Sequence, residues 1–197
     1  MSEPHADASA ARAVRGLEQA LETAGIVDAG EIDAAVDRVL DVAGSRPLGA
    51  GVVARAWTDP SFAARVLDDG NAAVADLGIT MAHGAEEPRL RVIANTPALH
   101  NLVVCTLCSC YPIALLGPSP AWYKSVAYRA RAVREPRQVL HEFGLDLAPA
   151  VRLRVWDSTA ETRYLVVPSR PPGTDDLAED DLAALVTRRG MIGTAAV

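Results

Sequence analysis

The chain has 197 residues, half of them hydrophobic, and a net charge of −6 at pH 7. A chain of this length buries roughly 70% of its unfolded surface, so it needs neither disulfides nor oligomerisation merely to fold. Its acidic balance argues against nucleic acid or an anionic membrane as a partner. No apolar run reaches the ~18 residues of a membrane span and no signal-like segment opens the chain, so we expect a cytoplasmic protein.

The first quarter of the chain predicts a helical arm. After residues 1–8, which we expect to be disordered, apolar residues recur at helical spacing up to Gly25 and again over residues 32–40. Neither helix carries a candidate ligand. We therefore interpret residues 1–48 as an arm that packs on a partner subunit, and residues 49–197 as the compact domain.

The compact domain opens with two predicted helices. The stretch Val52–Trp57 predicts a helix that ends at Asp59, and Asp59 or Ser61 is a suitable cap for the next one, with Pro60 in its first turn. We expect that second helix to continue to Gly78.

The rest of the chain mixes strands and helices. Leu90–Ala94 alternates like a half-buried strand, and Pro136–Phe143 predicts a short helix. Val151–Asp157 and Thr162–Pro168 are both β-patterned and separated by a short connection, so we expect a hairpin. Glu179–Arg188 predicts a last amphipathic helix, followed by an apolar tail that should dock. The fold class is α+β.

All three cysteines, Cys105, Cys108 and Cys110, fall within six consecutive residues; we call the segment Cys105–Cys110 the claw. An odd number of thiols this close together is not a disulfide framework. Thiolates are soft ligands, and so short a loop can wrap around one thiophilic metal ion. The claw therefore predicts a metal site.

The spacing of the claw distinguishes between kinds of metal site. A closed zinc site needs four ligands, and this chain offers three sulfurs, with His100 as the nearest histidine. Because Cys108 and Cys110 flank Ser109, two bound sulfurs would draw the intervening peptide nitrogens against the ion. A low-spin trivalent ion could take these amides as ligands and keep one position open. Such a position supports hydration or hydrolysis.

The segment Val104–Tyr111 resembles the metal-binding motif of the nitrile hydratase α subunit, and the similarity covers residues 10–197. Seven further blocks match the family's pattern in order: Val52–Pro60, Asn95–Asn101, Ala121–Ser125, Tyr128–Arg137, Glu142–Leu147, Arg154–Tyr164 and Leu185–Gly193. An isolated C-x2-C-x-C would be weak, whereas the ordered set of blocks is specific.

The resemblance implies a ligand set. Cys105 would be the axial thiolate, while Cys108 and Cys110, with the amides of Ser109 and Cys110, would form the equatorial plane. In the family, the cysteines at the positions of Cys108 and Cys110 are oxidised to sulfinic and sulfenic acid, two rungs of the thiol oxidation ladder. Thr106 and Tyr111 resemble the cobalt-type variant, so we expect Co(III) rather than iron.

The resemblance also implies a fold, partners and a reaction. The fold would be a layered α-β-β-α arrangement with a helical arm around a β subunit, which is one chain or divided into two. An activator or metallochaperone would load the cobalt, and the chain alone should be inactive. The reaction would be hydration of a nitrile to an amide, a lyase reaction, with Cys110, Cys108, Ser109 and Arg163 as the expected catalytic residues. Ser109 would help to hold the claw, and Arg163 matches an arginine of its hydrogen-bond network.

Two departures from the family pattern bear on the substrate. Ile113 stands where the family usually has tryptophan, and the stretch around Glu86 replaces one that contains a glutamine proposed to bond in the active site. We therefore expect a bulky or heterocyclic nitrile.

Several other polar or aromatic residues have a structural reading beside the functional one. Trp122 and Tyr123 are interpreted as core aromatics and His100 as a non-ligand. Asp157 either orients the claw or caps the turn of the expected hairpin.

Two other functions fit the claw. The γ subunit of thiocyanate hydrolase shares this motif and differs in the substrate and in a β partner split into two chains. A metallochaperone or storage protein would carry cobalt or iron on the same thiolates without catalysis. A purely structural zinc loop lacks a fourth ligand.

Overall fold

The structure is a computed structural model that describes residues 16–17, 20–21, 23–26, 47–82, 87–106 and 110–197. The chain divides into two compact units, Met1–Gly44 and Ser45–Val197. The described residues of the first unit include a helix end, where Gly25 has a φ of 66° and the Ile26 N–H donates to the Leu21 carbonyl. The helix end predicted at Gly25 is confirmed. The second predicted helix and the first eight residues lie outside the described residues.

The second unit opens with three helices: α3 (Leu48–Thr58), α4 (Pro60–Asp68) and α5 (Gly70–Ala75). Asp59 caps α4, because its Oδ1 accepts from the amides of Ser61 and Phe62 at 2.9 and 3.0 Å. This cap was predicted, but the single helix expected as far as Gly78 is wrong.

The break between α4 and α5 has a local cause and a tertiary one. The Asp69 side chain accepts from the Ala72 amide at 3.1 Å and so starts a new helix. Gly70 then lies so close to the following strand that a Cβ there would be 2.6 Å from the Leu90 carbonyl oxygen. The chain therefore bends to bring α5 against the sheet.

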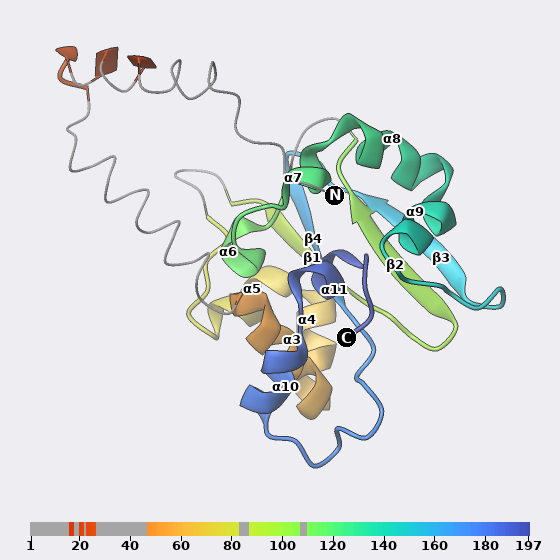
Figure 1. The fold of residues 1–197 in the computed structure, drawn as a ribbon. Helices are drawn as coiled ribbons and strands as arrows, with labels where there is room; N and C mark the ends of the chain where they lie inside the picture. Colours follow the sequence, from red (N-terminus) through yellow and green to blue (C-terminus); the bar gives the residue numbers. More distant parts are fainter. Residues whose placement is uncertain (1–15, 18–19, 22, 27–46, 83–86, 107–109) are drawn as a thin grey trace. The chain divides into compact units, whose positions relative to one another are not determined.

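Within the described residues, four strands form two parallel pairs (Figure 1): β1 (Arg89–Ala94) with β4 (Thr162–Val167), and β2 (Leu99–Val104) with β3 (Arg152–Asp157). The hairpin expected between β3 and β4 is therefore wrong. The short connection does form a turn, in which the Thr162 amide donates to Thr159 Oγ1 at 3.2 Å. This turn carries the chain from one sheet to the other, because β3 and β4 each pair with a more deeply buried parallel strand.

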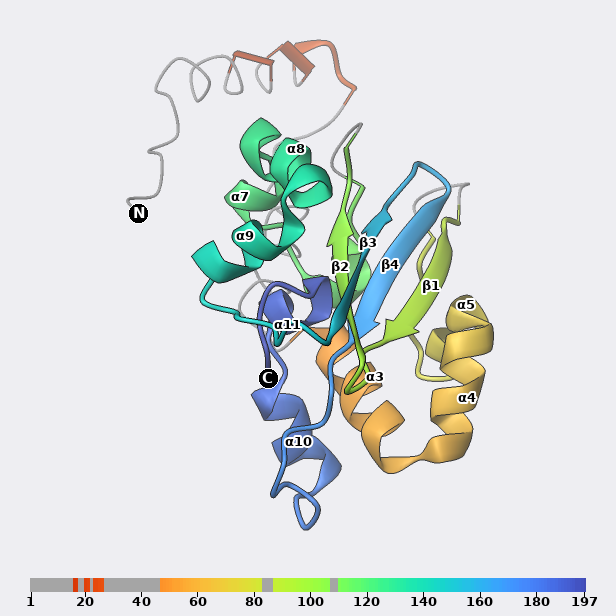
Figure 2. The same ribbon diagram turned by 90° about the vertical axis from the view of Figure 1, so that its right-hand side faces the viewer.

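The two sheets lie side by side between two helical layers, as Figure 2 shows. Helices α8 (Val126–Arg134) and α9 (Pro136–Glu142) pack on β2 and β3, whereas α4 and α5 pack on β1. Between them, β2 contacts β4. The α+β class and the α-β-β-α layering are confirmed. Parallel strands need both faces covered, and this arrangement covers each sheet with helices on one face and with the other sheet on the other.

Short helices complete the unit: α6 (Ile113–Leu116) and α7 (Ala121–Lys124) after the claw, and α10 (Glu179–Leu185) and α11 (Arg188–Ile192) at the end. The apolar tail docks as predicted, since Met191 and Ile192 are buried. Gly193 has a φ of 89°, and a Cβ there would overlap the Asn101 carbonyl oxygen of β2. No helix in the described part of the chain is long and apolar enough to span a membrane.

Candidate metal centre

The claw begins where β2 ends. Cys105 directly follows Val104, the last residue of the strand, and is fully buried, while Cys110 is 7% exposed. Cys108 and Ser109 lie outside the described residues. Among the described residues, no three His, Cys, Asp or Glu side chains converge as a metal site. The structure thus places two of the three predicted sulfurs, one near each end of the claw.

Asp157 holds the exposed side of the claw. It ends β3 directly opposite Val104, and its carboxylate accepts from both the Thr106 amide, at 2.9 Å, and the Thr106 hydroxyl, at 2.5 Å. Arg129 of α8 reaches the carbonyl of the same residue at 3.5 Å. Of the two readings of Asp157, these bonds support the one in which it orients the claw.

Two tyrosines hold the buried side of the claw. The Tyr123 hydroxyl donates to the Cys110 carbonyl at 3.1 Å, and the Tyr128 hydroxyl donates to the Val103 carbonyl at 2.7 Å. Burial raises the pKa of both phenols, which therefore stay protonated and able to donate. Tyr123 is 1% exposed, so its assignment to the core is confirmed, but its hydroxyl contacts the claw, which sequence reasoning missed.

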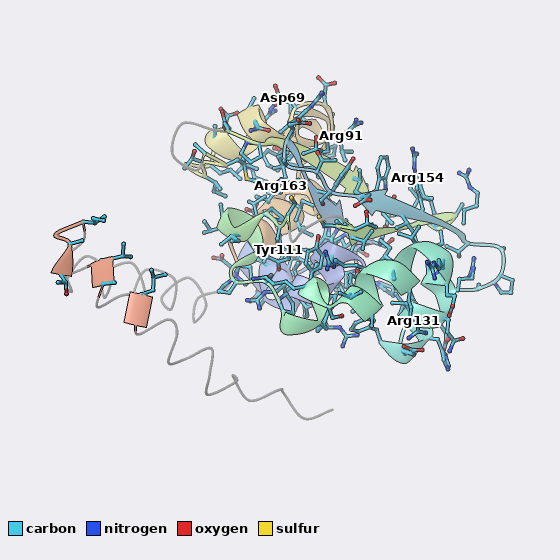
Figure 3. All side chains as sticks on the ribbon, turned by 90° about the horizontal axis from the view of Figure 1, so that it is seen from above. Asp69, Arg91, Tyr111, Arg131, Arg154 and Arg163 are labelled. Carbon is cyan, nitrogen blue, oxygen red and sulfur yellow. The ribbon has the colours of Figure 1, made fainter. Side chains whose placement is uncertain are left out.

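Arg163 lies at the start of β4, and its guanidinium donates to the carbonyls of Thr159 and, at 3.0 Å, Ala160. These bonds fix the β3–β4 connection. Figure 3 labels Arg163 on β4 and Tyr111 just after the claw. Among the described residues the structure does not bring Arg163 into a hydrogen bond with the claw, and its catalytic role stays a prediction.

His100 is a structural residue in β2. Its Nε2 donates to the Gly193 carbonyl at 2.8 Å, and its Nδ1 accepts from the side-chain Nδ2 of Asn95 at 3.2 Å. Burial lowers its pKa, which keeps the ring neutral. Both ring nitrogens are engaged, as expected for a histidine that is not a ligand.

The donor set suits a thiophilic metal ion. Two buried thiols lie in one short loop whose ends are fixed by hydrogen bonds on both sides, and the third thiol belongs to the same loop. Burial keeps water from competing for soft sulfur ligands. The residues present therefore fit the predicted ion.

Ile113 begins α6 three residues after the claw and is 45% exposed. The other departure from the family pattern, at Glu86, lies outside the described residues.

Comparison with known proteins agrees with this geometry. The family model of the nitrile hydratase α chain matches residues 8–195. The low-molecular-weight cobalt-containing nitrile hydratase α subunit of Rhodococcus rhodochrous is 46% identical over 190 residues, which cover 96% of this chain and 90% of the relative. The thiocyanate hydrolase γ subunit of Thiobacillus thioparus is 48% identical over 154 residues, 74% of this chain and 63% of the relative.

A solved structure has the same fold. A double mutant of the Fe-type nitrile hydratase from Comamonas testosteroni Ni1 superposes with a TM-score of 0.89 at 40% identity, over 98% of this chain and 92% of that chain. The layered fold is thus that of a class of enzyme subunits that includes a cobalt-containing and an Fe-type nitrile hydratase. Within that class, the chain belongs to the nitrile hydratase α-chain family.

Proposed function

We propose that this chain is the metal-holding α subunit of a nitrile hydratase, which adds water to a nitrile to give the amide. The observation that carries the proposal is the buried pair Cys105 and Cys110 in a loop anchored at the end of β2. Family membership and the nitrile hydratases among the relatives support the reaction.

The claw would hold one low-spin Co(III) ion through Cys105, Cys108, Cys110 and the backbone amides of Ser109 and Cys110. The cobalt-containing relative supports cobalt, although an iron-type structure has the same fold. When bound, the ion supplies a Lewis-acid position that polarises a nitrile or a water molecule. We propose sulfinic acid at Cys108 and sulfenic acid at Cys110, which are the second and first products when an external oxidant such as dioxygen oxidises thiolates along this ladder.

The chain's own residues would prepare this site. Asp157 fixes the backbone and hydroxyl of Thr106, the residue after the first cysteine, and so limits the directions in which that part of the loop can move. The burial of Cys105 keeps its sulfur from solvent. Ser109 and Arg163 are proposed to complete the hydrogen-bond network of the claw in the assembled enzyme.

A β subunit would cover the open side of the site. Val126 and Val133 of α8 are 71% and 52% exposed, and with Thr106 they line a groove of about 270 Å³. Apolar residues gathered beside a catalytic loop are typical of a surface that a partner covers. We propose a cytoplasmic heterodimer in which residues 1–48 pack on the β subunit, present as one chain or two, and an activator loads the cobalt.

The substrate would be a bulky or heterocyclic nitrile. Ile113 has a smaller side chain than the tryptophan of the family pattern and is half-exposed, which leaves space beside the claw.

Hydrolysis of thiocyanate is the second candidate, because the thiocyanate hydrolase γ subunit is 48% identical over the 74% of this chain that it matches. The two candidates differ in the charge of the substrate. A thiocyanate site must attract an anion, whereas a nitrile site takes a neutral molecule.

The experiment is elemental analysis and intact mass of the claw peptide from the chain co-produced with its β subunit, followed by assays with acrylonitrile, 3-cyanopyridine and thiocyanate. One cobalt per chain, two oxygens on Cys108, one on Cys110 and amide formation would support the proposal. Turnover of thiocyanate alone would select the second candidate. Zinc on three unmodified thiols would overturn both.

A further inference from the structure

The backbone on either side of the cysteines has two phenol donors. Tyr128 donates to the carbonyl of Val103, two residues before Cys105, and Tyr123 donates to the carbonyl of Cys110, the last residue of the claw. Both bonds are buried, and both tyrosines lie between the claw and β3 in the sequence. The two hydroxyls therefore bracket the claw at its two ends.

The bond to Val103 fills a position that the sheet leaves open. The neighbouring Val104 carbonyl accepts from the Ser158 amide, on the side of β2 that faces β3. Because successive backbone carbonyls point to opposite edges of a strand, the Val103 carbonyl points away from β3. A buried carbonyl needs a partner, and the Tyr128 hydroxyl supplies it at 2.7 Å.

Aromatic packing fixes both phenols. The ring centroid of Tyr123 lies 5.9 Å from that of Tyr128, and the Trp122 centroid lies 4.9 Å from that of Tyr128. Ser125 separates α7 from α8 and caps α8 by accepting from the Tyr128 amide at 3.1 Å. This break lets rings from two consecutive helices converge beneath one loop. Rings held in this way present their hydroxyls at fixed points.

We propose that Tyr123 and Tyr128 are positioning residues that set the distance between the two ends of the claw, so that the sulfurs of Cys105 and Cys110 converge on one ion. The inference rests on the proposed function, because a set distance between the two ends of the claw matters only when the claw binds a metal ion. Asp157 restrains the exposed side of the same loop, so the claw is held from both sides.

The test replaces each tyrosine by phenylalanine, which removes one oxygen and keeps the ring. Tyr164→Phe is the matched control, because Tyr164 is a partly buried tyrosine that packs on Trp156 with centroids 5.3 Å apart, and its hydroxyl makes no hydrogen bond to the claw among the described residues. All variants are made as the full chain with its β subunit. Cobalt per chain, the sulfur-to-cobalt charge-transfer absorption and the oxygens on the claw peptide are measured for each.

A second readout needs no metal. In the metal-free full chain, iodoacetamide should alkylate Cys105 and Cys110 slowly, because both are buried and react only when the loop opens. Loss of one hydrogen bond should raise that rate roughly 2- to 10-fold in Tyr123→Phe and Tyr128→Phe. The same variants should retain less cobalt and show a shifted absorption band, and Tyr164→Phe should match the wild type.

Phe143→Leu distinguishes the hydroxyls from the packing. Phe143 packs on Trp122 and Tyr128 with ring centroids 4.7 and 6.1 Å apart, and its side chain has no polar atom that could bond to the claw. This variant should melt at a lower temperature but change the spectrum and the alkylation rate less than Tyr123→Phe and Tyr128→Phe do. Equal spectra and rates for the tyrosine variants and the wild type would overturn the inference, as would an effect of Phe143→Leu as large as theirs. Zinc and unmodified thiols in the wild type would refute the proposed function alone, because the alkylation comparison would still test the tyrosines.

Discussion

Gly193→Ala should destabilise the protein more than a single methyl group ordinarily does. Gly193 follows α11 with a φ of 89°, and a Cβ there would overlap the Asn101 carbonyl oxygen of β2. Its own carbonyl accepts from His100 Nε2 at 2.8 Å. The residue therefore joins the end of the chain to the strand that leads into the claw.

The magnitude has two parts. A left-handed backbone costs a residue with a side chain about 1–2 kcal/mol relative to glycine. Relieving the overlap moves Gly193 away from β2 and breaks the bond to buried His100, which costs about 1–3 kcal/mol. The sum, roughly 2–5 kcal/mol, is a large share of a typical unfolding free energy of about 5–15 kcal/mol. At about 2–4 °C per kcal/mol, the melting temperature should fall by roughly 4–20 °C.

The assay is thermal and urea unfolding of the full chain, with Gly173→Ala as the matched control. Gly173 has a similar φ of 75°, but a Cβ there would meet no atom within 4 Å. The control should show only the left-handed part, about 1–2 kcal/mol. Equal losses in the two variants would refute the reasoning, because the contact with β2 would then contribute nothing.

Three further predictions concern the site and its supporting strand. Burial lowers the pKa of His100 in the folded protein, so the neutral ring favours folding at a pH above the unfolded pKa of about 6.5. As the pH falls below that value, the free energy of unfolding should decrease by at most ~1.4 kcal/mol per pH unit. Urea unfolding from about pH 7.5 to 5 measures this slope, and a slope unchanged in His100→Gln would contradict the assignment. Asp157→Asn keeps one acceptor for Thr106 and loses the other with the charge, so cobalt retention against a chelator should fall roughly 3- to 10-fold while Asp146→Asn has no effect. Ile113→Trp should lower kcat/KM for 3-cyanopyridine relative to kcat/KM for acrylonitrile by at least about 10-fold. An unchanged ratio would show that Ile113 does not contact the substrate.

The elements that could be predicted from the sequence are those with local signals. Asp59 with Pro60 identified the start of α4, and Gly25 identified a helix end, because caps act within one turn. β2 was missed because it is buried almost continuously and lacks alternation. Its parallel pairing with β3 depends on residues about fifty positions away, and no local pattern specifies it.

The site divides in the same way. The claw is contiguous, and its residue types alone indicate a metal. Its supports are distant: Asp157 was one of two readings, and the hydroxyls of Tyr123 and Tyr128 were not anticipated. A helical aromatic is expected to be buried, but the direction of its hydroxyl follows only from how two helices converge.

The separation between the claw and Asp157 has a consequence for the order in which the protein matures. Asp157, whose carboxylate binds Thr106, lies fifty-one positions further along the chain, and both tyrosines and the rest of β3 are synthesised in the interval. While the chain is being made, the three cysteines emerge after β2, before its partner strand β3 and before Asp157. In the proposed enzyme, cobalt capture and sulfur oxidation at a formed site would therefore follow translation of β3. Until then, the cysteines would need a reducing environment to stay usable.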